Sequence, residues 1–160
     1  MNFMQSLRAF YTKRFDYHSR SIRSEYWWVQ LFYLGVLILA STLDWTLLGY
    51  SDEAAFTPLA FIVELIFIVP GTCLTARRLH DVGLTGWAQL PSFLLYLSYI
   101  PSFSTFPFES GNDGIVGSVL LVVFIVYFIW LLINLIKDSQ PEPNRYGPSP
   151  KDEGVAEVFD

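Results

Sequence analysis

The chain has 160 residues, of which 52% are hydrophobic and 18% aromatic, and its formal net charge is −5. This composition is too apolar for an ordinary soluble domain of this length, so we expect an all-α integral membrane protein. The single cysteine, Cys73, can form no disulfide within the chain and has no accompanying cluster at metal-ligand spacing, so a disulfide scaffold is excluded and neither metal nor cofactor is expected.

Residues 1–25 predict a cytoplasmic amphipathic helix. They carry five basic residues spread along their length and no uninterrupted apolar stretch, which is unlike a signal peptide. At 100° per residue the apolar side chains share one arc. The helix could pack on the protein's own core or lie in the membrane interface; we favour the interface, because so small a membrane protein offers little soluble core. The apolar arc comprises Phe3, Met4, Leu7, Phe10, Tyr11 and Phe15.

Residues 26–136 predict a bundle of four transmembrane helices. A spanning helix needs about 17 to 25 mostly apolar residues, and four runs have that length. The third run is short and contains Pro91 and Pro101, so a re-entrant segment is its alternative. The four runs are Tyr26–Leu48, Phe56–Ala76, about Trp87–Phe103, and Ile115–Ile136.

The basic residues predict the orientation of these runs. All ten lie before the first run, between the second and third, or after the fourth. The two remaining loops, residues 49–55 and 104–114, carry acidic charges without a basic one. Positive charge gathers on the cytoplasmic side of membrane proteins, so both termini are expected in the cytoplasm and these two loops outside.

Residues 137–160 predict a cytoplasmic tail. The tail is polar, contains four prolines and ends in acidic residues, so its distal part is expected to be disordered. The sequence Asn144–Pro148 favours a tight turn, in which Arg145 and Tyr146 provide side chains that could dock on the rest of the protein.

Three motifs together carry a family resemblance. They are the segment Phe15–Trp28, the sequence RRLHDVGLTGW at Arg77–Trp87, and Asn144–Pro148. With these motifs the chain resembles, from about Phe10 to Pro150, the bacterial inner-membrane family catalogued as domain of unknown function 805. The resemblance implies a small, multi-pass protein of the bacterial inner (plasma) membrane, and it implies no established activity.

The same motifs predict a charged collar at the cytoplasmic membrane boundary. In the structural interpretation, which we favour, carboxylates pair with arginines and fix the helix ends. In the functional interpretation, surplus arginines and tryptophans bind a lipid phosphate or another anion. The lipid or anion-binding candidates are Arg20, Arg23, Arg77, Arg78, Trp27, Trp28 and Trp87. The structural collar comprises Glu25, His80, Asp81, Asn144, Arg145, Tyr146 and Gly147.

The sequence offers weak grounds for an enzyme. His80 and Asp81 are adjacent, but adjacent residues rarely present the geometry of a catalytic pair. No nucleophile motif, phosphate-binding loop or dinucleotide fingerprint is recognisable. We therefore expect no catalytic residue.

Glu64 lies within the second apolar run. A comparable acid at the centre of a membrane helix costs roughly 2.5 to 3.5 kcal/mol, so its side chain should be protonated, face the bundle or find a partner. Two interpretations stay open: a functional group of a proton-coupled pathway, or an interhelical hydrogen bond between neutral groups.

We therefore expect a non-enzymatic inner-membrane protein that serves envelope organisation or binds anionic lipid or a partner through the Arg/Trp collar. The alternative is a small proton-coupled transporter or channel that uses Glu64. Expected partners are membrane lipids, anionic ones included, with a second copy of the chain or another membrane protein as further candidates. The acidic net charge argues against nucleic acid.

Overall fold

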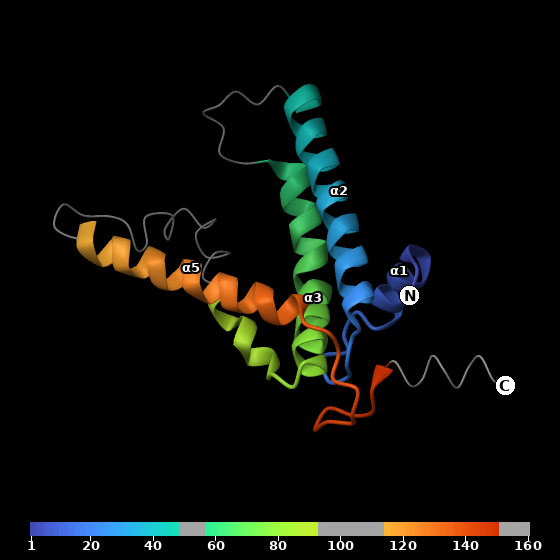
Figure 1. Cartoon of the computed structure of the whole chain (residues 1–160). Coiled ribbons are helices and arrows are strands. Elements are labelled where there is room, and N and C mark those ends of the chain that lie inside the picture. The colour runs from blue at the N-terminus through green and yellow to red at the C-terminus, as the bar shows by residue number, and fades with distance from the viewer. Residues whose placement is uncertain (49–56, 93–113, 151–160) are drawn as a thin grey trace.

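The structure, a computed structural model, describes residues 1–48, 57–92 and 114–150 (Figure 1). Over these residues the protein is all-helical, with no strand, as expected from the composition. The elements are α1 (Phe3–Thr12), α2 (Arg23–Leu48), α3 (Pro58–Asp81), the 3₁₀ helix η1 (Gly86–Ser92) and α5 (Gly114–Ile136).

Helices α2 and α3 lie side by side as an antiparallel hairpin (Figure 1). With 26 and 24 residues they are about 39 and 36 Å long, enough to cross a hydrocarbon core of about 30 Å. Within the described ranges these two helices are both long enough and apolar enough to cross a membrane. Only 17% of the most apolar window of each is buried, so these helices expose apolar side chains as membrane helices do.

Helix α5 is almost wholly apolar, but it does not complete a four-helix bundle with the described helices. Its C-terminal end lies beside α3, while its N-terminal part extends away from the hairpin (Figure 1). Most of the expected third span, residues 93–103, lies outside the described residues. The described start of that run is the 3₁₀ helix η1, which contains Pro91. Proline has no backbone N–H to donate to a helical hydrogen bond.

The end of α3 corrects a sequence prediction. The second apolar run was expected to end at Ala76, yet the helix continues through Asp81. Charge marks a membrane boundary in a hydropathy profile, but it does not stop a helix whose charged side chains find partners. The helix ends where Gly83 adopts a φ of +80°. The N–H groups of Gly83 and Leu84 then donate to the carbonyls of His80 and Leu79 at 3.0 and 2.9 Å, a Schellman motif.

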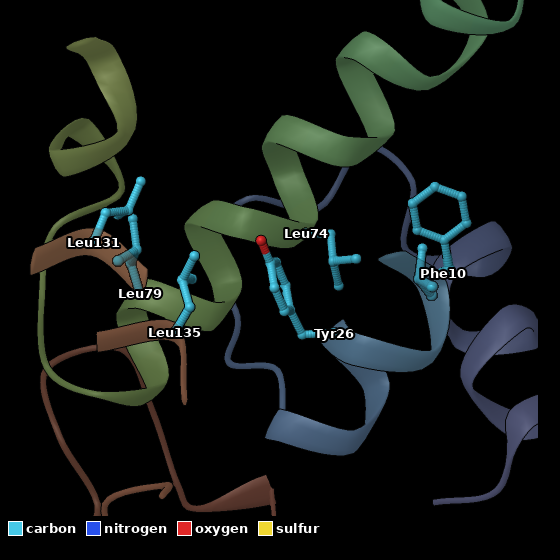
Figure 2. Packing of buried hydrophobic residues seen from close by; sticks show 7 residues of the cluster. Phe10, Tyr26, Leu74, Leu79, Leu131 and Leu135 are labelled. Atoms are coloured by element: carbon cyan, nitrogen blue, oxygen red, sulfur yellow. The ribbon is translucent and has the colours of Figure 1, made fainter. Parts of the chain in front are cut away.

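The buried apolar core is small and sits where α1, α5 and the α2–α3 hairpin meet (Figure 2). Each of these helices contributes one or more of its side chains, so the core ties them together at one end of the hairpin. The core residues are Phe10, Tyr26, Val29, Leu74, Leu79, Leu131 and Leu135.

Helix α1 packs on the hairpin with only part of its apolar arc. Asn2 and Gln5 form a capping box at its start, and Phe10 stacks on Phe67 of α3 with ring centroids 5.7 Å apart. Met4 and Tyr11, from the same arc, are about 70% exposed. The packing interpretation of α1 therefore holds for one side of the helix, and a second apolar side remains uncovered by the described residues.

Asp44 locks the opposite end of the hairpin. Its carboxylate projects from α2 and accepts hydrogen bonds from the backbone N–H groups of Leu59 and Ala60, at 3.1 and 3.0 Å. These donors belong to the first turn of α3, where Thr57 makes no side-chain cap and Pro58 has no N–H. A buried acid on one helix therefore caps the N-terminus of its neighbour.

Candidate functional site

Asp81, the last residue of α3, holds two arginines. Its Oδ1 accepts from Nε of Arg20 at 3.1 Å and lies 3.0 Å from Nη2 of the same ion pair, and its Oδ2 accepts from Nη1 of Arg78 at 2.5 Å. The Asp81 side chain is 0% exposed, and both guanidinium groups are buried with it. Each carboxylate oxygen thus forms a charge-assisted hydrogen bond away from water, where such bonds are strongest.

Further donors of Arg20 and Arg78 bind the last turn of α5 and the segment that follows it. Carbonyl groups at and beyond a helix C-terminus have no partner within the helix, and guanidinium groups satisfy them here. The chain after α5 is therefore fastened to the end of α3. Arg78 donates to the carbonyls of Leu135 and Lys137, and Arg20 donates to those of Gln140, Glu142 and Gly147.

Arg77 and Glu25 form a second ion pair. Nη1 of Arg77 donates to Oε1 of Glu25 at 3.0 Å, which joins α3 to the first turn of α2. Nε and Nη2 of Arg77 are buried and have no hydrogen-bond partner in the described part of the chain. The second ion pair is therefore less completely satisfied than the arrangement around Asp81.

The Asn144–Gly147 turn docks on His80. The backbones of Asn144 and Gly147 exchange hydrogen bonds of 3.1 and 2.9 Å, and Gly147 adopts a φ of +121° that favours glycine. Tyr146 stacks on the imidazole of His80 with centroids 3.7 Å apart, and Asn144 donates to the His80 carbonyl at 2.9 Å. The turn expected from the sequence is present, and Tyr146 and Asn144 both join it to His80.

His80 and Asp81 do not form a catalytic pair in this geometry. The imidazole Nδ1 lies 3.3 Å from the carbonyl oxygen of Ser19, and Nε2 accepts from the backbone N–H of Gly86 at 3.3 Å. One neutral tautomer, protonated at Nδ1, satisfies both contacts. Since the Asp81 oxygens are taken by arginines, the two residues fix separate parts of the chain.

The collar also contains a turn at Asp16 that was not predicted from the sequence. Asp16 accepts hydrogen bonds from the backbone N–H groups of His18 and Ser19 and from the Ser19 hydroxyl. Burial opposes ionisation of this carboxyl, but the three hydrogen bonds outweigh it and lower its pKa below the usual value. The Asp-x-x-Ser spacing is a turn signal, and the turn brings Arg20 toward Asp81.

The lipid or anion-binding candidates fall into two groups. Arg20, Arg77 and Arg78 are buried, so this arrangement gives a lipid phosphate no access to them. Three other binding candidates and Arg145 of the structural collar are exposed, and Trp27 is half-buried. The surface group is Arg23, Trp28, Trp87 and Arg145, the last with its guanidinium 4.7 Å from the centre of the Tyr146 ring.

Glu64 lies apart from the collar and lines a cavity of about 270 Å³ between α2, α3, η1 and α5. The walls are mainly apolar, with polar groups from Gln30, Thr72 and Gln89. Among the described residues that line this cavity, no side chain other than that of Glu64 is a carboxylate or a basic group. The described walls of that cavity therefore offer Glu64 no second carboxylate or basic group for a proton relay. Within the described ranges no group of three His, Cys, Asp or Glu side chains could hold a metal ion.

The fold and the collar together define a class. Two apolar helices of spanning length, exposed along their sides and tied at one end by buried charges, point to a small helical membrane protein. The chain belongs to the family described as "Protein of unknown function (DUF805)", whose family model matches residues 14–148. No curated protein and no solved structure matches the chain. The matched residues include the whole collar, from Arg20 to Gly147.

Proposed function

We propose that this protein is a non-enzymatic, multi-pass protein of the bacterial inner membrane, whose tied end lies at the cytoplasmic surface and interacts with anionic lipid. The observation that carries the proposal is the position of the buried network. It fastens the linker after α1, the end of α3 and the chain after α5 to one another, and exposed tryptophans and arginines occur in or next to these segments.

The orientation follows from charge. All ten basic residues lie in segments 1–25, 77–86 and 137–160, and the described parts of these segments meet at the collar. Under the positive-inside rule that end faces the cytoplasm. In this proposal α5 crosses the membrane as well, the run from Trp87 supplies a further span, and both termini are cytoplasmic.

The surface around the collar is suited to a lipid headgroup layer. Trp28 and Trp87 expose amphipathic rings of the kind that gather at membrane interfaces. Arg23 and Arg145 are exposed cations of the same collar. Each basic residue near an anionic membrane surface contributes about 1 kcal/mol of attraction, so the pair would contribute about 2 kcal/mol at low salt. The buried arginines hold this surface in shape.

The test is the dependence of thermal stability on anionic lipid. The protein is reconstituted in phosphatidylcholine vesicles with and without phosphatidylglycerol, and the unfolding temperature is measured at low and high salt. We expect phosphatidylglycerol to stabilise the wild type at low salt, and Arg23→Gln with Arg145→Gln to remove most of that gain. The matched control is Arg8→Gln with Lys13→Gln, which removes the same charge from α1. An equal loss in the control would show a general charge effect and contradict the proposal.

A further inference from the structure

A groove separates α1 from the membrane-facing side of α3. It has a volume of about 580 Å³ and lies apart from the collar. The stacked rings of Phe10 and Phe67 lie along it where α1 meets α3, and they keep the two helices from closing further. Its other walls include Leu7, Phe15, Leu65, Ile66, Val69 and Pro70.

The α3 wall of the groove is continuous with the surface that faces lipid. Leu65, Ile66 and Val69 are each about half exposed or more, and all three belong to a helix of spanning length. Pro70 also lines the groove, and because proline has no N–H, the carbonyl of Ile66 loses its usual donor within the helix. A molecule that fills this space therefore enters from the membrane and meets mostly apolar groups, as an acyl chain would.

One cation stands among these apolar walls. Arg14 lines the groove, donates from Nη1 to the carbonyl of Tyr11 at 3.0 Å, and lies 4.9 and 5.1 Å from the ring centres of Tyr11 and Phe15. None of the collar's three ion pairs includes Arg14. Its planar guanidinium is held by two rings and keeps donors for a phosphate, which it can bind in bidentate fashion.

We propose that this groove binds one anionic phospholipid, with an acyl chain along Ile66 and Val69 and the headgroup phosphate on Arg14. The combination of an apolar channel open to the membrane with a single uncompensated arginine selects a lipid over a soluble anion, which would leave the channel empty. The inference rests on the membrane placement proposed above, but it does not need the collar surface to bind lipid. Its lipid would sit between α1 and α3 and hold α1 in the interface.

The experiment measures how many phosphatidylglycerol molecules bind to each 160-residue chain. The protein is purified in mild detergent, exposed to increasing phosphatidylglycerol, and examined by native mass spectrometry. We expect one lipid per chain to bind more tightly than the rest. Arg14→Gln should weaken that lipid by about tenfold, the usual effect of losing a charge-assisted contact, and Val69→Trp should displace the chain with Arg14 intact.

Two matched variants define the controls. Lys13→Gln removes a neighbouring charge outside the groove, and Ile62→Trp adds the same ring to an exposed position of α3 outside it. Both should keep the tight lipid. The proposal is overturned if Arg14→Gln and Val69→Trp bind it as the wild type does, or if the controls lose it equally.

Two further measurements keep the result interpretable. Arg14→Lys keeps the positive charge but loses the planar guanidinium that binds a phosphate through two donors, so it should bind the lipid more weakly than the wild type. This variant replaces Arg14→Gln as the test if Arg14→Gln does not fold. Unchanged binding in both Arg14→Lys and Val69→Trp overturns the proposal. Arg23→Gln with Arg145→Gln should keep the tight lipid. If that double variant loses it while Arg14→Gln does not, the site lies at the collar, and the groove is wrong while the proposed function stands.

Discussion

Replacing Asp81 with asparagine should destabilise the protein more than any other single change in the collar. The carboxylate serves two buried guanidinium groups, one on each oxygen. In Asp81→Asn one oxygen becomes an NH₂ group that faces an arginine donor, and two positive charges remain buried without a counter-charge. The same two arginines, Arg20 and Arg78, also donate to carbonyl groups at and beyond the end of α5. When Asp81 no longer holds these arginines in place, the contacts of that segment weaken as well.

The magnitude follows from burial. An exposed ion pair contributes about 0 to 1 kcal/mol, whereas removing one partner of a buried pair costs about 3 to 5 kcal/mol. Both arginines and Asp81 are at most 1% exposed at their side chains, so the higher range applies. Glu25→Gln breaks a single pair with Arg77, so its cost should lie at or below the lower end of that range.

The assay is reversible unfolding by sodium dodecyl sulfate in mixed micelles, followed by circular dichroism. The cycle consists of Asp81→Asn, Arg78→Gln and the double variant, with Glu142→Gln as the control that removes an exposed acid from the tail. We expect the double variant to be less destabilised than the sum of the two single variants by 1 kcal/mol or more, within the range of about 0.5 to 3 kcal/mol typical of contacting residues. Additive losses, or a loss in Glu142→Gln equal to that in Asp81→Asn, would refute the reasoning.

Three further predictions concern other parts of the fold. Gly83→Ala should cost about 1 to 2 kcal/mol in the same assay, because a residue with a φ of +80° is strained and the new Cβ would lie 2.7 Å from the Gln140 amide; Gly35→Ala, where nothing lies within 4 Å, should be neutral or stabilising. Asp44→Leu should cost about 1 to 3 kcal/mol, because a buried and a part-buried N–H group of α3 lose their acceptors, and no loss would mean that the cap is dispensable. Glu64→Gln should leave unfolding unchanged within about 0.5 kcal/mol, because an amide replaces a neutral acid in most hydrogen bonds; acid-driven flux into liposomes that this variant abolishes would instead support the transporter alternative.

Hydropathy was sufficient to place α2, α3 and α5. Their apolar runs match the helices to within a few residues at most ends, because a membrane helix must be both long and apolar. The largest error, at the end of α3, has a physical cause. A profile scores Arg77 and Arg78 as the end of a segment, although Glu25 and Asp81 neutralise them and let the helix continue.

The collar was predictable as a group of residues but not as a set of pairs. Charge and motif position brought Arg20, Arg78 and Asp81 together, whereas the sharing of one carboxylate by two arginines depends on distances that sequence spacing does not contain. Asp44 was missed for a related reason. The signal was an acid near the end of one apolar run and a proline at the start of the next, and its meaning depends on the antiparallel pairing of the two helices.

Accessibility of single cysteines in intact cells tests most directly the claim that the collar is the cytoplasmic end of a multi-pass membrane protein. In a Cys73→Ser background, cysteine replaces Thr85 and Glu142 near the collar, or Ser51 and Asn112, which lie outside the described residues. An impermeant maleimide should label Ser51→Cys and Asn112→Cys in intact cells, and label Thr85→Cys and Glu142→Cys only after permeabilisation. Labelling of Thr85→Cys from outside intact cells would contradict the account.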